Sequence, residues 1–535
     1  MFAAFLSPLA PAAVLLLGAF VLAFLPETGR PQRWKLPGPG LVAPLMVGLA
    51  FGTLFFLRIT PGLDPTGAGL ELLSGWRFAD AGPGAALTIR ADTVGLAFLI
   101  LVHLFLLTLS LVHPAGFGLA RRTAAPHQPF WGWLALTGSV CLLLVAANGL
   151  TLGYAVFLFD LLAAGYWWGQ NRPALAVSRL FLGILTAAAL PLASLVAPAG
   201  GFLLGLAFWL RLGLLPFFEL DTLEDENFDA LLYFGLTLIV SLYLFIRTPL
   251  TPVPVLRWFF VLSGVIAGLL AWLSPVRGRR LVYLTLVLGL LIFSADPTNQ
   301  AAVAGFTIGL VPALVALWVT PRLGRPNLSE SAWLWPYFPA LGATVTLLGA
   351  PFSLGGEIYH VVYRQFLALP AVGLVAGGIA AQALAFTSLL DYWRDLRQGD
   401  ELHARRSVAS VVIMVPFLVP GLAPLVLTAI SGLDVSTALN GEGLQFWWVL
   451  VTAVVLAVGL VQLRLRLAAV WGMSPQQLVR LPVALLARLG TALLYAADRL
   501  GRLVLRLDIL LLGRHYLGWA LLTALMGAII FFLGT

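Results

Sequence analysis

Lysine is almost absent from this chain of 535 residues, since Lys35 is its single lysine. Cysteine is equally scarce. Cys141 alone excludes a disulfide framework, a thiolate metal cage and an iron–sulfur cluster, and its apolar neighbours favour a small core residue. Charged residues make up only 10% of the chain, against 60% hydrophobic residues. A soluble domain of this size needs far more polar surface, so the composition predicts a polytopic membrane protein.

Apolar runs long enough to cross about 30 Å of hydrocarbon recur from end to end, and the short loops between them leave no room for a soluble domain. The first run lacks a basic flank and a cleavage pattern, so we expect a retained span rather than a removable signal. The runs predict an all-α protein of about 16 transmembrane helices. We expect these near residues 8–25, 40–57, 94–112, 131–147, 152–168, 180–196, 201–218, 231–246, 258–273, 281–293, 301–319, 333–353, 366–390, 408–429, 446–463 and 516–533.

The net charge of +8 is carried almost wholly by arginine, and the arginines gather in alternate loops. This placement indicates a topological signal rather than binding of nucleic acid. The positive-inside rule makes the richer side cytoplasmic and places Met1 outside. The longest interruption, Arg58 to Asp92, then lies outside, where we expect a small hairpin or an ordered cap over the bundle.

A different pattern runs from Pro482 to Asp508, where polar residues recur every three or four positions. This spacing predicts an amphipathic helix with an arginine-rich stripe, lying along the cytoplasmic side of the membrane before the last span. The helix is either an anchor in the headgroup layer or a strut along a neighbouring subunit.

Two opposite charges lie deep inside predicted spans, Asp160 in the fifth and Arg211 in the seventh. A charge at mid-membrane is costly, so it normally lines a polar pathway or pairs with another charge. Asp160 is therefore either a proton-carrying or charge-coupling acid or a buried carboxyl that locks two helices together. Arg211 can polarise a neighbour but cannot release a proton at accessible pH. We expect the two side chains to face each other inside the bundle.

Two predicted spans carry helix-breaking prolines. Pro216 follows Arg211 by five residues, and a proline there removes a backbone donor and frees carbonyl groups of the preceding turn. Pro351 lies among glycines at the end of the twelfth span. Paired interruptions suggest an internal repeat, which in transport proteins is often inverted and holds its sites near mid-membrane.

Other polar residues are outlying candidates. His103 lies midway through the third span, where it either titrates or is a neutral, hydrogen-bonded core residue. Glu357 and His360 lie close to a predicted membrane boundary, where we expect a solvated or interfacial position. Tyr243 and Arg247 end the eighth span and are expected to be interface anchors.

These residues resemble the antiporter-like membrane subunits of respiratory complex I (NADH:quinone oxidoreductase), a family shared with Mrp-type cation/proton antiporters and membrane-bound hydrogenases. Asp92, in LTIRADTVGLAFLILVHL, is similar to the family's aspartate before its third helix. Residues 147–150 (ANGL), followed by FLFDLL, are similar to its AnDLl pattern. Asp160 stands where the family has a fifth-helix glutamate, and Arg211 where it has a lysine followed by a break.

Two more segments carry the resemblance. SLYLFIR, which ends at Arg247, is similar to the family's GlYgllR, and residues 279–281 are similar to its KRllAYSS. The chain departs from the family at Ile239, where a lysine is expected, and at Phe218, where a histidine is expected. Thr285 and Thr307 are the nearest remnants of the tenth- and eleventh-helix polar residues.

The resemblance implies a non-catalytic subunit of a redox-driven translocase in a bacterial inner membrane, with other membrane subunits of a complex I-like or hydrogenase-like assembly as partners. Electron-transfer cofactors would belong to those partners, so we expect this chain to bind no cofactor and no metal. The implied division is 1–130 (helices 1–3), 131–250 and 251–400 (two halves of an inverted-repeat core), 401–470 (helices 14–15), 475–512 (lateral helix) and 513–535 (last helix).

Three functions stay open. The family's mechanism needs groups that take up and release protons, so Asp160 is the expected carrier and Arg211 the fixed charge beside it. A transport-inactive scaffold with a permanent Asp160–Arg211 pair is the alternative. A polytopic glycosyl or lipid-carrier transferase is a third reading, for which only the loop from Arg58 to Asp92 is long enough.

Overall fold

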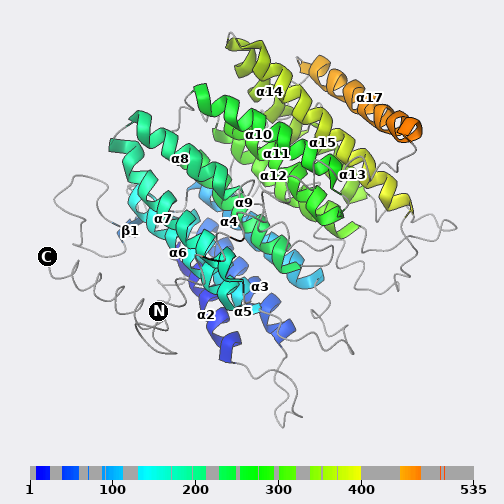
Figure 1. The fold of residues 1–535 in the computed structure, drawn as a ribbon. Coiled ribbons are helices and arrows are strands. Elements are labelled where there is room, and N and C mark those ends of the chain that lie inside the picture. Colours follow the sequence, from blue (N-terminus) through cyan, green and yellow to red (C-terminus); the bar gives the residue numbers. More distant parts are fainter. Residues whose placement is uncertain are drawn as a thin grey trace.

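The computed structural model of the chain describes residues 8–24, 39–59, 70–71, 87–90, 92–112, 130–169, 172–195, 197–212, 228–248, 254–274, 276–294, 300–320, 338–350, 353–369, 371–398, 446–471, 495 and 499. They form a bundle of helices (Figure 1). The helices are α2 (Ala10–Phe24), α3 (Pro39–Ile59), α4 (Thr93–Val112), α5 (Phe130–Leu144), α6 (Gly149–Gly169), α7 (Pro173–Leu195), α8 (Ala197–Arg211), α9 (Phe228–Arg247), α10 (Pro254–Leu273), α11 (Arg277–Ser294), α12 (Gln300–Val319), α13 (Phe338–Leu348), α14 (Leu354–Ala368), α15 (Val372–Gln398) and α17 (Trp447–Trp471).

The composition explains why these segments are helical. A helix satisfies its backbone hydrogen bonds within one segment, which hydrocarbon demands because it offers no water. Six of the described helices are long and apolar enough to cross a membrane: α4, α6, α9, α10, α15 and α17. The predicted all-α, multi-pass membrane fold is confirmed.

Burial separates a central helix from a peripheral one. In α9, 94% of the residues of the apolar span are buried, whereas in α17 only 17% are. Figure 1 shows α17 at one edge of the bundle, beside α15, and α6, α7 and α8 toward the opposite edge. Helix α12 packs against both α4 and α9, so the two predicted halves of the chain share one interior.

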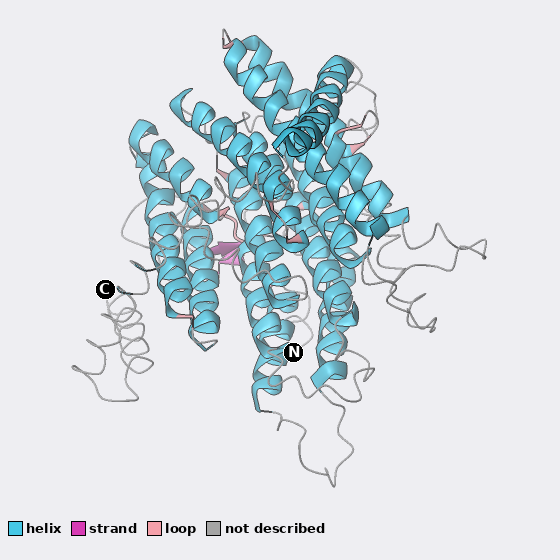
Figure 2. Cartoon of the chain, turned by 45° about the vertical axis from the view of Figure 1, so that its right-hand side comes forward, coloured by secondary structure: helices cyan, strands magenta, loops and turns pink. Residues whose placement is uncertain are grey.

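The loop between α3 and α4 holds the antiparallel pairing that the sequence predicts. Strand β1 (Leu70–Glu71) pairs with β2 (Thr88–Ile89), with Leu70 opposite Ile89 and Glu71 opposite Thr88. The backbone N–H of Thr88 donates to Thr151 Oγ1 at 2.9 Å, and Ile89 forms a bridge with Ala146. These contacts fix the strand pair onto the end of the α5–α6 connection and the first turn of α6. Figure 2 shows the strands in magenta among the helices.

Helices α13 and α14 differ from the prediction, which had one span at 333–353 and no helix at 354–365. Helix α13 ends at Leu348, and Gly349 follows with φ +69°, in the left-handed region that favours glycine. Ser353 then caps α14, because its hydroxyl accepts the backbone N–H of Gly356 at 3.2 Å. Helix α14 was missed because its polar residues interrupt the apolar run.

Several predictions fall outside the described residues. These are the spans at 408–429 and 516–533 and most of the amphipathic helix at 482–508. Within that helix, Tyr495 and Arg499 are described, and both are helical. The total of about 16 spans and the division into regions therefore stay predictions.

The turn between α13 and α14 leaves no room for a side chain at Gly355. A Cβ there would overlap the carbonyl oxygen of Thr346. We expect Gly355→Ala to destabilise the protein by about 2 kcal/mol, because backbone must move. Gly342→Ala, on α13, is the matched control. Its Cβ meets nothing within 4 Å, so it should stabilise the helix by about 0.5–1 kcal/mol. Thermal unfolding in detergent measures both, and equal effects would contradict the packing argument.

Candidate functional site

Asp160 and Arg211 form an ion pair in the interior of the bundle. Asp160 lies midway along α6 and Arg211 at the last residue of α8, and both are 0% exposed. Arg211 Nη1 donates to Asp160 Oδ1 at 3.1 Å and Nη2 donates to Oδ2 at 2.5 Å. The planar guanidinium matches both carboxylate oxygens at once. The structure therefore brings together the two charges that the sequence singled out.

Helix α7 completes the site from a third direction. Arg211 Nη2 also donates to Thr186 Oγ1 at 3.0 Å, and the Thr186 hydroxyl donates to the carbonyl of Leu182 at 2.8 Å. Gly183 lies opposite Asp160, where a Cβ would come within 2.9 Å of the Asp160 Cβ. The missing side chain lets α6 and α7 approach closely enough for the carboxylate to reach α7.

A second guanidinium faces the same carboxylate. Arg179 of α7 is 1% exposed, and its Nη1 lies 4.0 Å from Asp160 Oδ1. Its guanidinium also lies over the ring of Tyr233 on α9, 4.6 Å from the centroid, which is a cation–π geometry. Asp160 thus lies between two arginines. We call Asp160, Arg179, Thr186 and Arg211 the buried charge cluster.

Aromatic side chains lead from this cluster toward the start of α9. The Trp167 ring meets the edge of Tyr233 at 5.1 Å. One turn further, Trp133 Nε1 donates to Asp229 Oδ1 at 2.5 Å, and Tyr166 hydrogen-bonds to the same carboxylate. Asp229 thereby ties α5 and α6 to α9.

A second ion pair joins the residue before α4 to the end of α9. Arg247 Nη2 donates to Asp92 Oδ1 at 2.5 Å, and Arg247 Nε donates to the Tyr243 hydroxyl at 2.9 Å. Tyr243 is 0% exposed and donates to the carbonyl of Leu144 at 2.7 Å. The prediction that Tyr243 is an interface anchor is wrong, because its side chain is fully buried in the bundle. For Arg247 the same expectation stays a prediction. Both partners lie about 100 residues or more away in the sequence, so the local pattern does not reveal them.

His103 is buried within α4. Its Nδ1 lies 2.7 Å from the carbonyl of Leu99, so Nδ1 carries the proton, and its ring lies 6.4 Å from that of Phe51. Nε2 is buried and meets no hydrogen-bond partner among the described residues. Within that part of the chain, no hydrogen bond or ion pair links His103 to the buried charge cluster.

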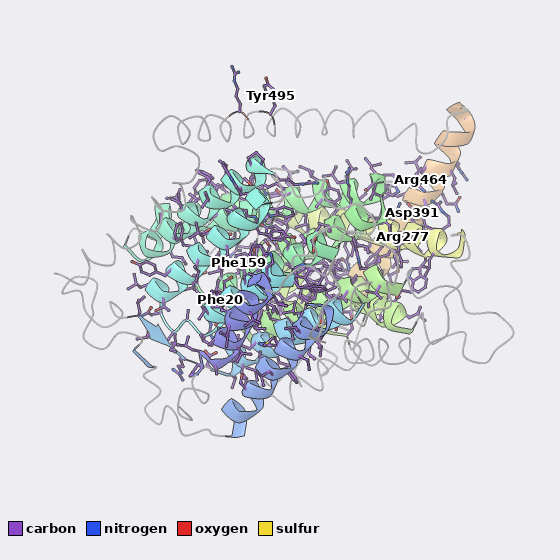
Figure 3. The ribbon with its side chains drawn as sticks, turned by 90° about the horizontal axis from the view of Figure 1, so that it is seen from below. Phe20, Phe159, Arg277, Asp391, Arg464 and Tyr495 are labelled. Carbon is purple, nitrogen blue, oxygen red and sulfur yellow. The ribbon has the colours of Figure 1, made fainter. Side chains whose placement is uncertain are left out.

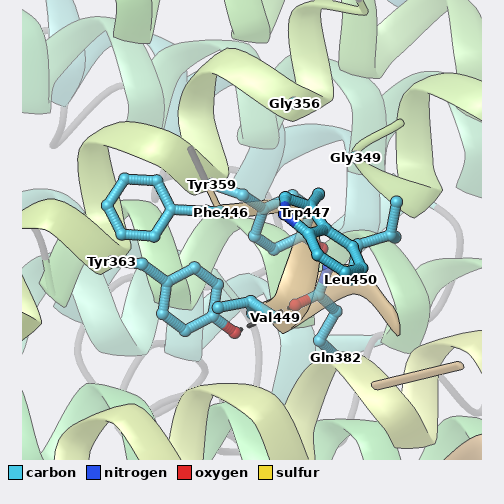
Figure 4. A pocket seen from close by; sticks show the side chains of 9 residues that line it. All are labelled: Gly349, Gly356, Tyr359, Tyr363, Gln382, Phe446, Trp447, Val449 and Leu450. Atoms are coloured by element: carbon cyan, nitrogen blue, oxygen red, sulfur yellow. Dashed lines mark hydrogen bonds between the residues drawn. The ribbon is translucent and has the colours of Figure 1, made fainter. Parts of the chain in front are cut away.

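A neutral polar cluster lies at the break between α13 and α14 (Figure 4). Tyr363 donates to Gln382 Oε1 at 2.9 Å, and Gln382 Nε2 donates to the carbonyl of Leu348, at the end of α13, at 3.4 Å. Gln382 thus satisfies a carbonyl that the break leaves without a helical partner. The adjoining cavity, of about 10 Å³, is also lined by Phe446 and Trp447 and has room for about one water.

His360 lies on α14 beside this cluster, 2% exposed, with its ring 5.2 Å from that of Phe446. The expected solvated or interfacial position of His360 is therefore wrong, because α14 continues the bundle where the prediction ended a span. Glu357 is also on α14, but its side chain lies outside the described residues. Pro216 and Pro351 lie outside them as well.

Sequence reasoning missed Arg179. It is as deeply buried as Arg211, and an arginine within an apolar helix is an equally strong signal. In the described part of the chain, no group of three or more His, Cys, Asp or Glu side chains could hold a metal ion. The expectation that the chain binds no cofactor stays a prediction.

The Asp92–Arg247 pair predicts an acid-dependent loss of stability. Burial alone would raise the pKa of Asp92, but the hydrogen bond and charge of Arg247, the N–H of Gly95 and the charge of Arg90 together hold it below 3.8. A depressed pKa stabilises the fold at pH values above the unfolded-state pKa, and this contribution is lost as the pH falls through the folded-state pKa.

We therefore expect Arg247→Gln to lower stability by about 1 kcal/mol at pH 7 and by much less near pH 3. Thermal unfolding of the wild type and the variant across this range measures the difference. Arg172→Gln removes an exposed arginine and is the control, whose effect should not change with pH. A difference for Arg247→Gln that stays constant down to pH 3 would contradict the ion pair.

The buried charge cluster predicts an order of stability losses. Arg211→Met leaves Asp160 with Arg179, and we expect a loss of about 3 kcal/mol. Asp160→Leu leaves two buried guanidiniums without this carboxylate, so its loss should be larger, about 5 kcal/mol. The double variant should recover part of the Asp160→Leu loss. Thermal unfolding and membrane yield test the order, and a larger loss for Arg211→Met would refute it.

Comparison with known proteins gives a clear result for the fold. No protein-family model and no curated protein sequence matches the chain. Among solved structures, the chain is similar to a chain of respiratory complex I from Thermus thermophilus with bound aureothin. The identity is 18% and the TM-score 0.53, and the match covers 79% of this chain and 99% of the complex I chain. The same complex with bound NADH matches at 15% identity and a TM-score of 0.54, over 81% and 99%.

A chain of the Mrp complex from Dietzia sp. DQ12-45-1b matches at 15% identity and a TM-score of 0.59, over 100% of this chain and 63% of that one. Identities this low carry no information on substrate or partners. The match over most of the chain concerns the arrangement of the helices. The chain therefore shares its fold with chains of respiratory complex I and of an Mrp complex, as its sequence resemblance predicted.

Proposed function

We propose that this protein is an antiporter-like membrane subunit of a multi-subunit, complex I-like assembly in a bacterial inner membrane, and that Asp160 carries the charge by which it couples to ion translocation. The observation that supports the proposal is the position of Asp160, which is fully buried and lies between Arg211 and Arg179. The shared fold supports the assembly, in which partner subunits would carry the electron-transfer cofactors.

The chemistry of the cluster assigns one role to each side chain. Neither guanidinium releases a proton at accessible pH, so only Asp160 can change its charge within the cluster. The two arginines and Thr186 stabilise the carboxylate. If a charge change in a neighbouring subunit draws Arg211 away, Asp160 loses two charge-assisted hydrogen bonds and binds a proton more readily. The return of Arg211 then expels that proton.

The geometry lets this motion be small. Asp160 Oδ1 lies 3.1 Å from Arg211 and 4.0 Å from Arg179, so a small displacement of Arg211 is enough to change the positive charge that the carboxylate meets. His103 and Glu357 are proposed as outlying stations of the same pathway. The coupling between subunits would be electrostatic.

A transport-inactive scaffold is the second candidate, and the composition of the cluster favours it. Both partners of Asp160 are arginines, whereas the family has a lysine at the position of Arg211. An arginine holds a carboxylate in a fixed bidentate geometry and cannot take part in proton transfer. In this role the cluster would only hold α6, α7 and α8 together. The transferase reading receives no support from the shared fold.

Proton translocation by the native assembly in inverted membrane vesicles separates the two candidates. We expect Asp160→Asn to lower the number of protons moved per electron transferred at least tenfold, because the amide cannot carry a proton or a charge. Arg211→Lys should retain most of the activity, since a lysine keeps the charge and can itself release a proton.

Asp391→Asn is the matched control. Asp391 is a second buried aspartate that accepts two hydrogen bonds from one arginine, Arg464, at 2.8 and 3.0 Å, and it lies outside the buried charge cluster. We expect this variant to lower the yield of the assembly without lowering the ratio of protons to electrons. An unchanged ratio in Asp160→Asn would remove the translocation proposal and leave the scaffold.

A further inference from the structure

Arg179 faces Asp160 without making a hydrogen bond to it. Its Nη1 atom lies 4.0 Å from Asp160 Oδ1, about 1 Å beyond the N···O distance of a charge-assisted hydrogen bond. Arg211, in contrast, donates to both oxygens of the same carboxylate. Arg179 and Arg211 are equally buried, at 1% and 0% exposed, so exposure to solvent does not explain the difference.

The ring of Tyr233 offers Arg179 a competing contact. The guanidinium carbon lies 4.6 Å from the centroid of this ring. The face of an aromatic ring is negative and attracts a cation, and the attraction is stronger where water is excluded. Tyr233 is only 1% exposed. The ring and the carboxylate of Asp160 therefore compete for one guanidinium in the interior of the bundle.

A second buried pair shows the arrangement with a more distant ring. The guanidinium of Arg464 lies 5.9 Å from the ring of Trp272, and it donates to both oxygens of Asp391, at 2.8 and 3.0 Å. Figure 3 shows Asp391 and Arg464 toward one side of the bundle and Phe159, the residue before Asp160, toward the other. The two sites are therefore separate examples of an arginine between a ring and a carboxylate.

The pair formed by Arg247 and Asp92 has an intermediate ring distance. Its guanidinium lies 5.0 Å from the ring of Tyr243, and Nη2 donates to Asp92 Oδ1 at 2.5 Å. Of these three described arginines, Arg179 lies closest to a ring, and its contact with Asp160 is the only one of the three ion pairs longer than a hydrogen bond. This order is expected if the ring draws the guanidinium away from the carboxylate.

Neighbouring helices hold the ring of Tyr233 in place. It packs edge to face against the ring of Trp167 on α6, with the centroids 5.1 Å apart. One turn earlier on α9, Asp229 accepts a hydrogen bond from Trp133 Nε1 at 2.5 Å, and Tyr166 hydrogen-bonds to the same carboxylate. These contacts tie the first turns of α9 to α5 and α6, so the ring has a fixed position.

We propose that Tyr233 is a positioning residue, whose ring holds Arg179 away from Asp160 and thereby keeps the carboxylate able to take up a proton. If both arginines donated hydrogen bonds to Asp160, the charged form would be favoured too strongly for its charge to change. With Arg179 over the ring, Arg211 alone supplies the guanidinium hydrogen bonds. The role in proton uptake rests on the proposed function, whereas the position of Arg179 does not.

Phenylalanine and pentafluorophenylalanine at position 233 separate the attraction of the ring from its packing. The two side chains have nearly the same shape, but the fluorine atoms withdraw electrons and remove the negative face of the ring. The first readout is the infrared spectrum of the purified full-length protein at neutral pH, in which Asp160→Asn identifies the carboxylate bands of Asp160. We expect Tyr233→Phe to keep these bands in place. Pentafluorophenylalanine should shift them, because Arg179 then hydrogen-bonds to the carboxylate.

The second readout is proton translocation by the native assembly in inverted membrane vesicles. We expect pentafluorophenylalanine at position 233 to lower the ratio of protons to electrons about tenfold relative to Tyr233→Phe. In an Arg179→Gln background, the two side chains should give the same ratio, because the ring then has no guanidinium to hold. A role of Tyr233 in packing alone predicts no difference between the two side chains in either background.

The same two side chains at position 243 are the matched control. Tyr243 also contacts a guanidinium, but that of Arg247, which is paired with Asp92. Exchanging them there should leave the bands of Asp160 unchanged.

Identical Asp160 bands for both side chains at position 233 would overturn the proposal. Shifted bands with an unchanged ratio, in an assembly where Asp160→Asn lowers that ratio, would refute the role in proton uptake. If Asp160→Asn itself leaves the ratio unchanged, the proposed function fails, and shifted bands would still support the position of Arg179.

Discussion

A charge inside an apolar bundle needs an opposite charge from another helix, and this requirement organises the structure. Asp160 joins α6 to α8, Asp92 joins the start of α4 to the end of α9, and Asp391 joins α15 to α17. Apolar faces alone do not select one neighbour from another in lipid, because acyl chains are as apolar as leucine. The ion pairs determine which helices become neighbours. Breaking one leaves an uncompensated buried charge, so each pair fixes which helices are neighbours, even where its net contribution to stability is small.

The near absence of lysine changes what these pairs can do. A lysine beside a buried carboxylate can lose its proton, so both members of such a pair can titrate. An arginine stays charged, and every pair described above uses arginine. Charge changes in the buried charge cluster therefore depend on Asp160 alone. Arginine also fixes the position of the carboxylate. Arg211 and Arg464 each contact two oxygens of one carboxylate, which a lysine cannot do.

The sequence predicted the membrane fold from its composition and the buried charges from their rarity. It did not predict contacts between segments that lie far apart in the sequence. Asp160 and Arg211 could be found because a charge among apolar residues is conspicuous. Arg179 was missed because the predicted span began at residue 180, which made it a boundary residue. The contacts of Tyr243 and Arg247 were missed because their partners, Leu144 and Asp92, lie far away in the sequence. The burial of His360 was missed with α14, whose polar residues hide a helix from an apolar-run criterion.

The two helix interruptions show that the halves of the chain are chemically different. Helix α8 ends at Arg211, so a fixed charge lies at the helix end, whose carbonyl groups favour a cation. At the end of α13, the neutral amide of Gln382 satisfies the carbonyl of Leu348, and Tyr363 completes the contact. A neutral amide and a phenol respond weakly to a change of charge nearby. Of these two interruptions, an electrostatic signal from a neighbouring subunit would therefore act through the end of α8, where a carboxylate lies between two cations.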